Sequence, residues 1–298
     1  MKNQIKTILL LGSLSALVVG FGALVAPGYL YLFGALALAM NLGAYFFSDR
    51  IVLRMQGAEE VTEREVPELY ASVRELAARA EIPMPRVYVI PDRQPNAFAT
   101  GRNPEHGVVA VSAGLLELLD RRELRAVIAH ELAHIKNRDI LISSIAAAIA
   151  ALITYVAQAL SFGAMFGGGS DEEDEGGSPF GGLLVALVAP MAATLIQLGI
   201  SRSREYLADE TGARIARDPE ALARALLKLE RASTVIPAQT SPAAASLFII
   251  NPLAGVETLS RWFSTHPRTE DRVRRLRALG RNSAGASEQN AESVLLGK

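Results

Sequence analysis

The sequence predicts a mainly α-helical membrane protein that also carries a soluble α+β domain. Half of the residues are hydrophobic (50%) and 20% are charged, but the two kinds are separated along the chain. Three runs, at 7–48, 140–170 and 176–201, contain no charged residue. Uncharged runs of this length are typical of membrane helices, whereas the mixed segments 49–139 and 202–281 are typical of a folded soluble domain.

The run 7–48 predicts a two-helix membrane hairpin that occupies residues 1–48. It is about twice the roughly 20 residues that a helix needs to cross a bilayer, and Pro27-Gly28 near its middle predicts a turn. We expect the spans at Ile8–Val25 and Tyr29–Phe47. A cleaved signal peptide is the alternative for the first span, but its apolar region would be shorter and no second span would follow at once.

The two later runs predict a second membrane hairpin at residues 140–201. The acidic segment 171–175 separates them and is expected to form a solvated extracytoplasmic loop. Helices buried in a soluble core are the alternative, because Ser143, Ser144 and Gln158 place polar groups in the first run. With four transmembrane helices, the protein would be a multi-pass membrane protein in contact with the lipid bilayer.

Lysine and arginine flank the predicted spans on one side only. Basic pairs stand outside each hairpin, at Lys2 and Lys6, Arg50 and Arg54, Lys136 and Arg138, and Arg202 and Arg204. The connections within the two hairpins contain no lysine or arginine. Basic flanks stay in the cytosol, so we expect both termini and the soluble domain there. The net charge of -1 gives no electrostatic reason to expect binding to nucleic acid.

The soluble domain is expected in two parts, residues 49–139 and 202–281. In the first part a polar linker is followed by helical and strand patterns; we expect a linker at 49–66, helices at 67–80 and 114–119, and strands at 86–90, 96–100 and 108–112. In the second part we expect helices at 218–231 and 269–279, followed by a disordered tail at 282–298.

The chemistry of the chain is concentrated at His130-Glu131-Leu132-Ala133-His134. Histidines four residues apart lie on one face of a helix, so both imidazoles can hold one metal ion. Glu131 would stand beside the open coordination position and act as general base. Asp120 is expected to cap this helix, with Glu123 three residues later. There is no cysteine, so the remaining ligand must come from histidine or a carboxylate.

Glu205 is the favoured third ligand. It lies four residues before Asp209, so on a helix the two carboxylates share a face. Glu205 would then bind zinc while Asp209 accepts a hydrogen bond from a ligand histidine. An ordinary surface helix with paired charges is the alternative. A hairpin of two spans would return Glu205 to the membrane face where the histidines lie.

His266 and Arg272 are candidates for stabilising the oxyanion of a tetrahedral intermediate. Pro267 restricts the loop that carries His266, and Arg272 lies six residues later in the last predicted helix. A cationic pair can stabilise such an oxyanion, but a loop histidine with a solvated arginine explains the sequence equally well. His106, in the turn between two strands, is expected at the surface.

Together, four motifs resemble the HtpX membrane metalloproteases, relatives of the CaaX prenyl proteases. They are HELAHIKN at 130–137, PNAFATG at 95–101, SREYLAD at 203–209 and THP at 265–267. The resemblance covers nearly the whole chain. It implies a zincin-like domain and a zinc endopeptidase of the cell (inner) membrane that degrades unfolded or damaged membrane proteins.

The resemblance also implies roles for individual residues. Glu205 would be the third zinc ligand, Asp209 and Asn137 would orient the ligands, and His266 and Arg272 would belong to the catalytic surroundings. The substrate cleft would be lined by Asn96, Ala97, Phe98, Val109 and Val111. An exposed strand edge there would accept extended peptides of many sequences.

Two other functions are compatible with these patterns. A CaaX-type processing protease would need more spans than the four expected here, in order to enclose a large chamber. A non-catalytic membrane scaffold or metal sensor would need the ligands but not Glu131. The physiological substrates and the oligomeric state are left open by the sequence.

Overall fold

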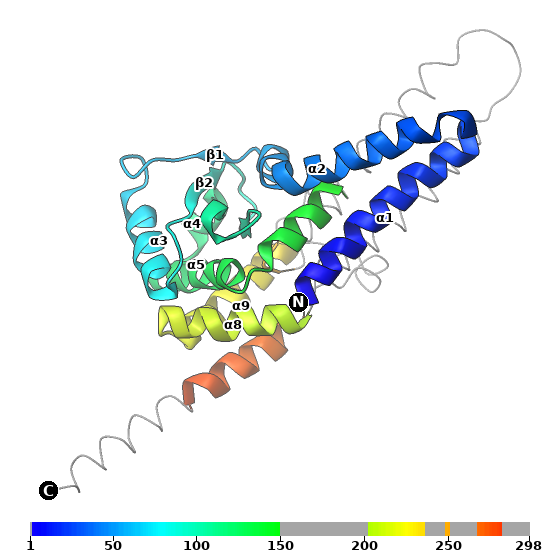
Figure 1. Ribbon diagram of the computed structural model, residues 1–298. Helices are drawn as coiled ribbons and strands as arrows, with labels where there is room; N and C mark the ends of the chain where they lie inside the picture. The colour runs from blue at the N-terminus through cyan, green and yellow to red at the C-terminus, as the bar shows by residue number, and fades with distance from the viewer. Residues whose placement is uncertain (1, 150–201, 236–247, 251–266, 282–298) are drawn as a thin grey trace, which may run out of the picture.

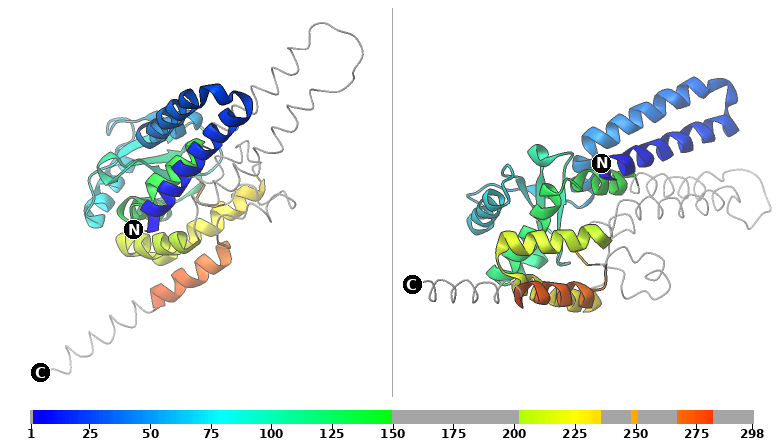
Figure 2. Two further views of the ribbon diagram at one scale, coloured as in Figure 1. Left: turned by 45° about the vertical axis from the view of Figure 1, so that its right-hand side comes forward. Right: turned by 60° about the horizontal axis from the view of Figure 1, so that its bottom comes forward.

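The computed structural model describes residues 2–149, 202–235, 248–250 and 267–281. Within these ranges an α+β domain carries a long helical hairpin that projects from one side (Figures 1 and 2). The acidic segment 171–175, most of the second predicted hairpin, His266 and the tail 282–298 lie outside the described residues.

The projecting hairpin consists of α1 (Lys2–Val25) and α2 (Leu30–Met55), joined by a 3-10 turn at Pro27–Tyr29. A hydrogen bond of 2.7 Å from the Asn41 amide to the Ser15 hydroxyl links the two helices. Among the described residues, one helix, Pro27–Met55, is long and apolar enough to cross a membrane. The mainly helical fold is therefore confirmed with one strong membrane helix, and α2 runs past the expected boundary at residue 48.

A four-stranded sheet forms the centre of the α+β domain, in the order β1-β2-β4-β3. Strands β2 (Arg86–Ile90) and β4 (Val108–Ser112) are parallel, and β3 (Ala97–Thr100) runs antiparallel to β4. The short strand β1 (Glu59–Glu60) pairs antiparallel with β2, although the sequence predicted only a linker there. Within the described chain, β3 is an edge strand and β4 is an inner one.

Apolar side chains cover both faces of this sheet. On one face, Ala97, Val109 and Val111 pack with residues of α3 (Pro67–Ala80) and α5 (Arg121–Lys136). On the other face, Phe98 and its neighbours pack with the end of α2 and with Ala147 of the following helix, residues 140–149. The sheet therefore lies between helices α3 and α5 on one face and the bases of the projecting helices on the other.

The remaining helices agree closely with the sequence. The short α4 (Ala113–Leu118) precedes α5, and α8 (Arg202–Ala216) and α9 (Pro219–Val235) pack against α5. A last helix at 269–281, orange in Figure 1, lies beside α8. Asp120 and Glu123 form the predicted capping box at the start of α5. The Asp120 side chain accepts a hydrogen bond of 2.9 Å from the Glu123 amide, and the Glu123 side chain accepts one of 3.1 Å from the Asp120 amide.

Candidate metal centre

Helix α5 supplies two imidazoles and a carboxylate from one buried face. His130 and Glu131 are 1% and 3% exposed, and His134 is half-buried. The apolar residues of the same helix, such as Val127, Ile128 and Leu132, pack into the main core. This packing fixes the helix, so the polar groups are held in place rather than free to rotate into solvent.

Helix α8 crosses α5 at close range and brings Glu205 and Asp209 to the histidines. The approach depends on Gly212, because a Cβ atom at this position would lie 2.7 Å from the Cα atom of His130. Any larger residue would push the two helices apart. The predicted shared face of Glu205 and Asp209 is present, since both side chains are buried and directed at α5.

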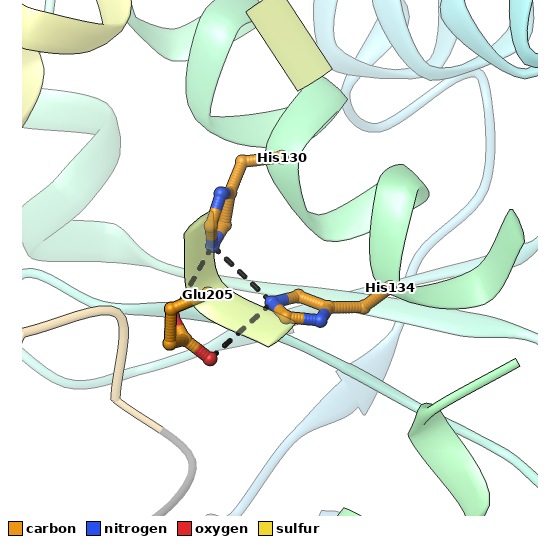
Figure 3. Close-up of side chains that lie close together, drawn as sticks. All are labelled: His130, His134 and Glu205. Atoms are coloured by element: carbon orange, nitrogen blue, oxygen red, sulfur yellow. Dashed lines mark hydrogen bonds and ion pairs between the residues drawn. The ribbon is translucent and has the colours of Figure 1, made fainter. Parts of the chain in front are cut away.

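His130, His134 and Glu205 converge on one point (Figure 3). The two Nε2 atoms lie 3.2 Å apart, and they lie 3.7 and 3.8 Å from the two carboxylate oxygens of Glu205. Ligand atoms bound to one tetrahedral ion at about 2.1 Å lie about 3.4 Å from each other. The distances and the donor set, two imidazoles and one carboxylate, therefore fit a single divalent ion.

A carboxylate stands behind each imidazole. Asp209 Oδ1 lies 3.1 Å from Nδ1 of His130, and Asp139 Oδ2 lies 3.1 Å from Nδ1 of His134. A carboxylate in this position fixes the ring and leaves Nε2 free for a metal. Asp139 was not predicted. Asn137, which was predicted to orient a ligand, ends α5 instead, and its buried Nδ2 has no hydrogen-bond partner in the described chain.

Comparison with known proteins identifies the family. Residues 63–280 match peptidase family M48. The chain belongs to this family. The protease HtpX homologue of Syntrophobacter fumaroxidans is 53% identical over 283 residues, which cover 94% of this chain and 100% of that protein. The homologue of Pelotomaculum thermopropionicum is 54% identical over 279 residues, which cover 93% and 99%.

The crystal structure of S. mikatae Ste24p superimposes with a TM-score of 0.48 at 18% identity, over 92% of this chain and 64% of that one. The family assignment rests on the sequence matches. It confirms the predicted HtpX resemblance and the predicted metalloprotease activity. Membership of M48 also implies a divalent metal cofactor and protein substrates.

Burial and neighbouring carboxylates together set the protonation of Glu131 and His134 at the M48 metal centre. Burial raises the pKa of Glu131 to about 8, and the nearby Glu205 carboxylate adds to the effect. Burial acts against the charged form of His134, but the carboxylates of Asp139 and Glu205 outweigh it and raise its pKa to about 10. Without a metal, the centre therefore holds protons that a dication would displace.

Arg272 is fully buried behind this centre, at 1% exposure. Its Nε and Nη2 atoms donate hydrogen bonds of 2.8 and 2.7 Å to Asp209. Its Nη1 atom donates to the carbonyl of Ile249 at 2.7 Å, and Nη2 lies 3.5 Å from Nε2 of His130. Arg272 therefore binds and orients Asp209, the carboxylate that lies behind His130. His266, its predicted companion, lies outside the described residues.

The residues predicted to line the substrate cleft are all buried. Asn96 is 3% exposed, and its Oδ1 accepts a hydrogen bond of 3.3 Å from the Ile249 amide. The side chains of Ala97 and Phe98 on β3, and of Val109 and Val111 on β4, pack into the two apolar clusters. What faces the metal centre is the backbone of β3, whose Ala99 amide lies close enough to the Glu131 carboxylate to lower its pKa. His106 is exposed, as expected.

Proposed function

We propose that this M48 peptidase is a multi-spanning zinc endopeptidase of the cell (inner) membrane that cuts unfolded or damaged membrane proteins. The observation that carries the proposal is the convergence of His130, His134 and Glu205, whose ligand atoms lie within 4.8 Å of one another. Glu131 lies beside them on the same helix. The apolar helix 140–149 follows almost at once, which supports a reaction centre close to the membrane.

His130, His134 and Glu205 would hold one zinc ion per chain. Two imidazoles and one glutamate are a common ligand set for catalytic zinc, which keeps a further position open. Zinc, when bound, supplies a Lewis acid that activates water and polarises a peptide carbonyl. The hydrogen bond between Asp139 and Nδ1 of His134 keeps that imidazole in the tautomer that presents Nε2 to the ion, and Asp209, 3.1 Å from Nδ1 of His130, is placed to do the same once the ion is bound.

Glu131 acts as the general base. Its carboxylate is 3% exposed and its pKa is raised to about 8 by burial; a neighbouring dication would lower that pKa again and restore the ionised form. The ionised carboxylate takes a proton from the attacking water. It then delivers this proton to the leaving nitrogen, so that the peptide bond breaks with release of a neutral amine instead of an amide anion.

The outer edge of β3, which pairs with no further strand among the described residues, receives the substrate as an additional strand. The carbonyl of Asn96 accepts a hydrogen bond of 2.9 Å from the Ser112 amide of β4. Along an antiparallel strand, residues whose backbone groups bond the neighbouring strand alternate with residues whose backbone groups point away from it. The backbone groups of Ala97 and Ala99 therefore point away from β4, toward the outer edge of the sheet. Backbone pairing at this edge does not read side chains, which supports cleavage of many sequences. Val109 and Val111 support the sheet from its inner strand.

The proposed topology has four spans, with both termini and the metal centre in the cytosol. It rests on the basic residues that flank only one side of the spans. The arrangement of the first hairpin supports it, because α1 begins and α2 ends beside the α+β domain while their connection lies at the far end (Figure 1). A peptidase centre at this boundary would meet segments of membrane proteins that emerge into the cytosol.

Casein digestion by the purified full chain tests the proposal. Glu131→Gln should retain zinc but lose at least about a hundred-fold in rate, the lower range for a lost general base. A chelator should stop the wild-type protein. Glu117→Gln, the same change at an exposed glutamate of α4, should leave the rate unchanged. Digestion by Glu131→Gln at the wild-type rate would show that the mechanism is wrong.

A further inference from the structure

We propose that Arg50, Arg54 and Arg102 form a binding site for the phosphate headgroup of an anionic phospholipid, at the point where α2 leaves the membrane. We call these three residues the headgroup site. The inference rests on the proposed insertion of α1 and α2 into a bilayer. It adds a lipid ligand to the protein and a reason for the catalytic domain to respond to membrane composition.

The level of the bilayer surface is marked on α2 itself. Residues 30–48 of this helix carry no charge, and at about 1.5 Å per residue they match a hydrocarbon core of roughly 30 Å. Tyr45, Phe46 and Phe47 end this stretch with 36%, 47% and 49% of their surfaces exposed. Exposed aromatic rings at the end of a span are typical of the membrane–water interface. Arg50 and Arg54 therefore lie at the height of the phosphates.

The catalytic domain contributes a third cation at the same height. The guanidinium of Arg102, from the turn after β3, lies 5.8 Å from the centre of the Phe46 ring. On α2, the guanidinium of Arg50 lies 5.5 Å from the centre of the Phe47 ring, and Arg54 follows one turn later on the same side of the helix. Two guanidinium groups, those of Arg50 and Arg102, thus lie against the exposed aromatic rings, and Arg54 adds a third cation one helical turn further along α2.

These cations have no carboxylate partners in the described chain. Arg50, Arg54 and Arg102 form no salt bridge with any described residue, whereas the neighbouring Arg86 lies 3.2 Å from Asp49. Glu105, an exposed acid in the same turn as Arg102, leaves the group of three arginines with a net positive charge. Guanidinium groups bind phosphate oxygens in a bidentate fork, and the cytosolic leaflet supplies anionic headgroups at this level.

Arg102 is held in position before any ligand binds. Its Nη2 atom lies 2.5 Å from Nε2 of His106, and Nδ1 of His106 lies 2.6 Å from Oδ1 of Asn103. The turn is tight, because Gly101 has φ +131° and a Cβ atom there would lie 2.3 Å from the His106 carbonyl oxygen. The ordered turn reduces the conformational entropy that a headgroup contact would cost.

Headgroup binding acts on the substrate strand. The Thr100 hydroxyl lies 2.6 Å from the Ser144 hydroxyl, which also accepts a hydrogen bond of 3.3 Å from the Gly101 amide. These contacts tie the end of β3 to the helix 140–149, and the Ala99 amide of the same strand contacts Glu131. A headgroup held by Arg102 would restrain β3 next to the general base, so anionic lipid should raise the rate of proteolysis.

The test uses the full chain reconstituted in vesicles of phosphatidylcholine, with or without phosphatidylglycerol. Native mass spectrometry measures the phosphatidylglycerol retained, casein digestion measures activity, and carbonate extraction measures insertion. Arg102→Gln and Arg50→Gln should each weaken retention about five-fold, from roughly 1 kcal/mol per basic residue at the surface. Arg64→Gln, an exposed arginine before α3, should retain lipid as the wild type does.

Further measurements distinguish a lipid from free phosphate as the ligand, and separate a failure of the headgroup site from a failure of the peptidase mechanism. Inorganic phosphate should neither bind nor activate, and binding of phosphate equal to that of phosphatidylglycerol would overturn a lipid site. Equal retention by wild type, Arg102→Gln and Arg50→Gln would overturn it as well. If wild type retained phosphatidylglycerol but digested nothing in any lipid or in detergent, the peptidase mechanism would fail while the headgroup site stood.

Discussion

Replacing Arg272 by glutamine should destabilise the folded protein by about 3–5 kcal/mol, the usual cost of breaking a buried ion pair. The guanidinium is 1% exposed and makes two hydrogen bonds to Asp209 and one to the Ile249 carbonyl, all between 2.7 and 2.8 Å. Glutamine would leave the Asp209 carboxylate buried without a cation. Since a domain of this size melts about 2–4 °C lower per kcal/mol, thermal unfolding of the metal-free protein in detergent should fall by roughly 10 °C.

Arg277→Gln is the matched control. Arg277 lies on the same helix, is 46% exposed at its side chain and pairs with Glu220 at 3.2 Å, so its loss should cost under about 1 kcal/mol. Adding Asp209→Asn to Arg272→Gln should cost less than the sum of the two single changes, because the unpaired charge is removed. If Arg272→Gln melted like Arg277→Gln, the positioning role would be refuted, and an oxyanion role for Arg272 would regain support.

Three further predictions follow from the same geometry. Asp139→Ala should weaken zinc binding about ten- to a hundred-fold in a competitive chelator titration, and Asn137→Ala should not; equal losses would refute the assignment of Asp139. Zinc affinity should rise with pH and level off above about 10, because neighbouring carboxylates overcome burial and raise the pKa of His134 to about 10, and zinc must displace that proton; a pH-independent affinity would contradict this. The native chain has no cysteine, so single cysteines can report the topology in intact cells. An impermeant thiol reagent should label Gly28→Cys, outside the cell membrane, and leave Arg64→Cys, in the cytosol, unlabelled; labelling of Arg64→Cys would reverse the topology.

Local signals in the sequence predicted most of the elements. The helix 67–80 and the strands 86–90 and 108–112 have the predicted bounds, because proline and glycine mark their ends and their apolar patterns are strong. Strand β1 was missed because Glu59-Glu60 has no strand propensity of its own. It forms a strand because β2 offers it a free edge, which only the tertiary fold provides.

The site shows the same division between local and tertiary information. Spacing alone brought His130 and His134 together, but nothing local indicated that Asp139 turns back to His134. That reversal depends on Arg138, which adopts the left-handed conformation with φ 56°, and on a hydrogen bond of 3.2 Å from the Asp139 amide to the His134 carbonyl. Similarly, an arginine in an amphipathic helix is usually solvated, and Arg272 is buried only because Asp209 of α8 lies opposite.

Zinc content of purified variants tests the central claim most directly. Wild-type protein should contain one zinc per chain by inductively coupled plasma mass spectrometry, and Glu205→Gln should contain none, because the third ligand would be neutral and a poor match for the ion. Glu210→Gln makes the same change on the same helix, at an exposed glutamate paired with Arg214 at 2.5 Å, and should retain one zinc. Full occupancy in Glu205→Gln would contradict the account, since the ion would then be held by another carboxylate.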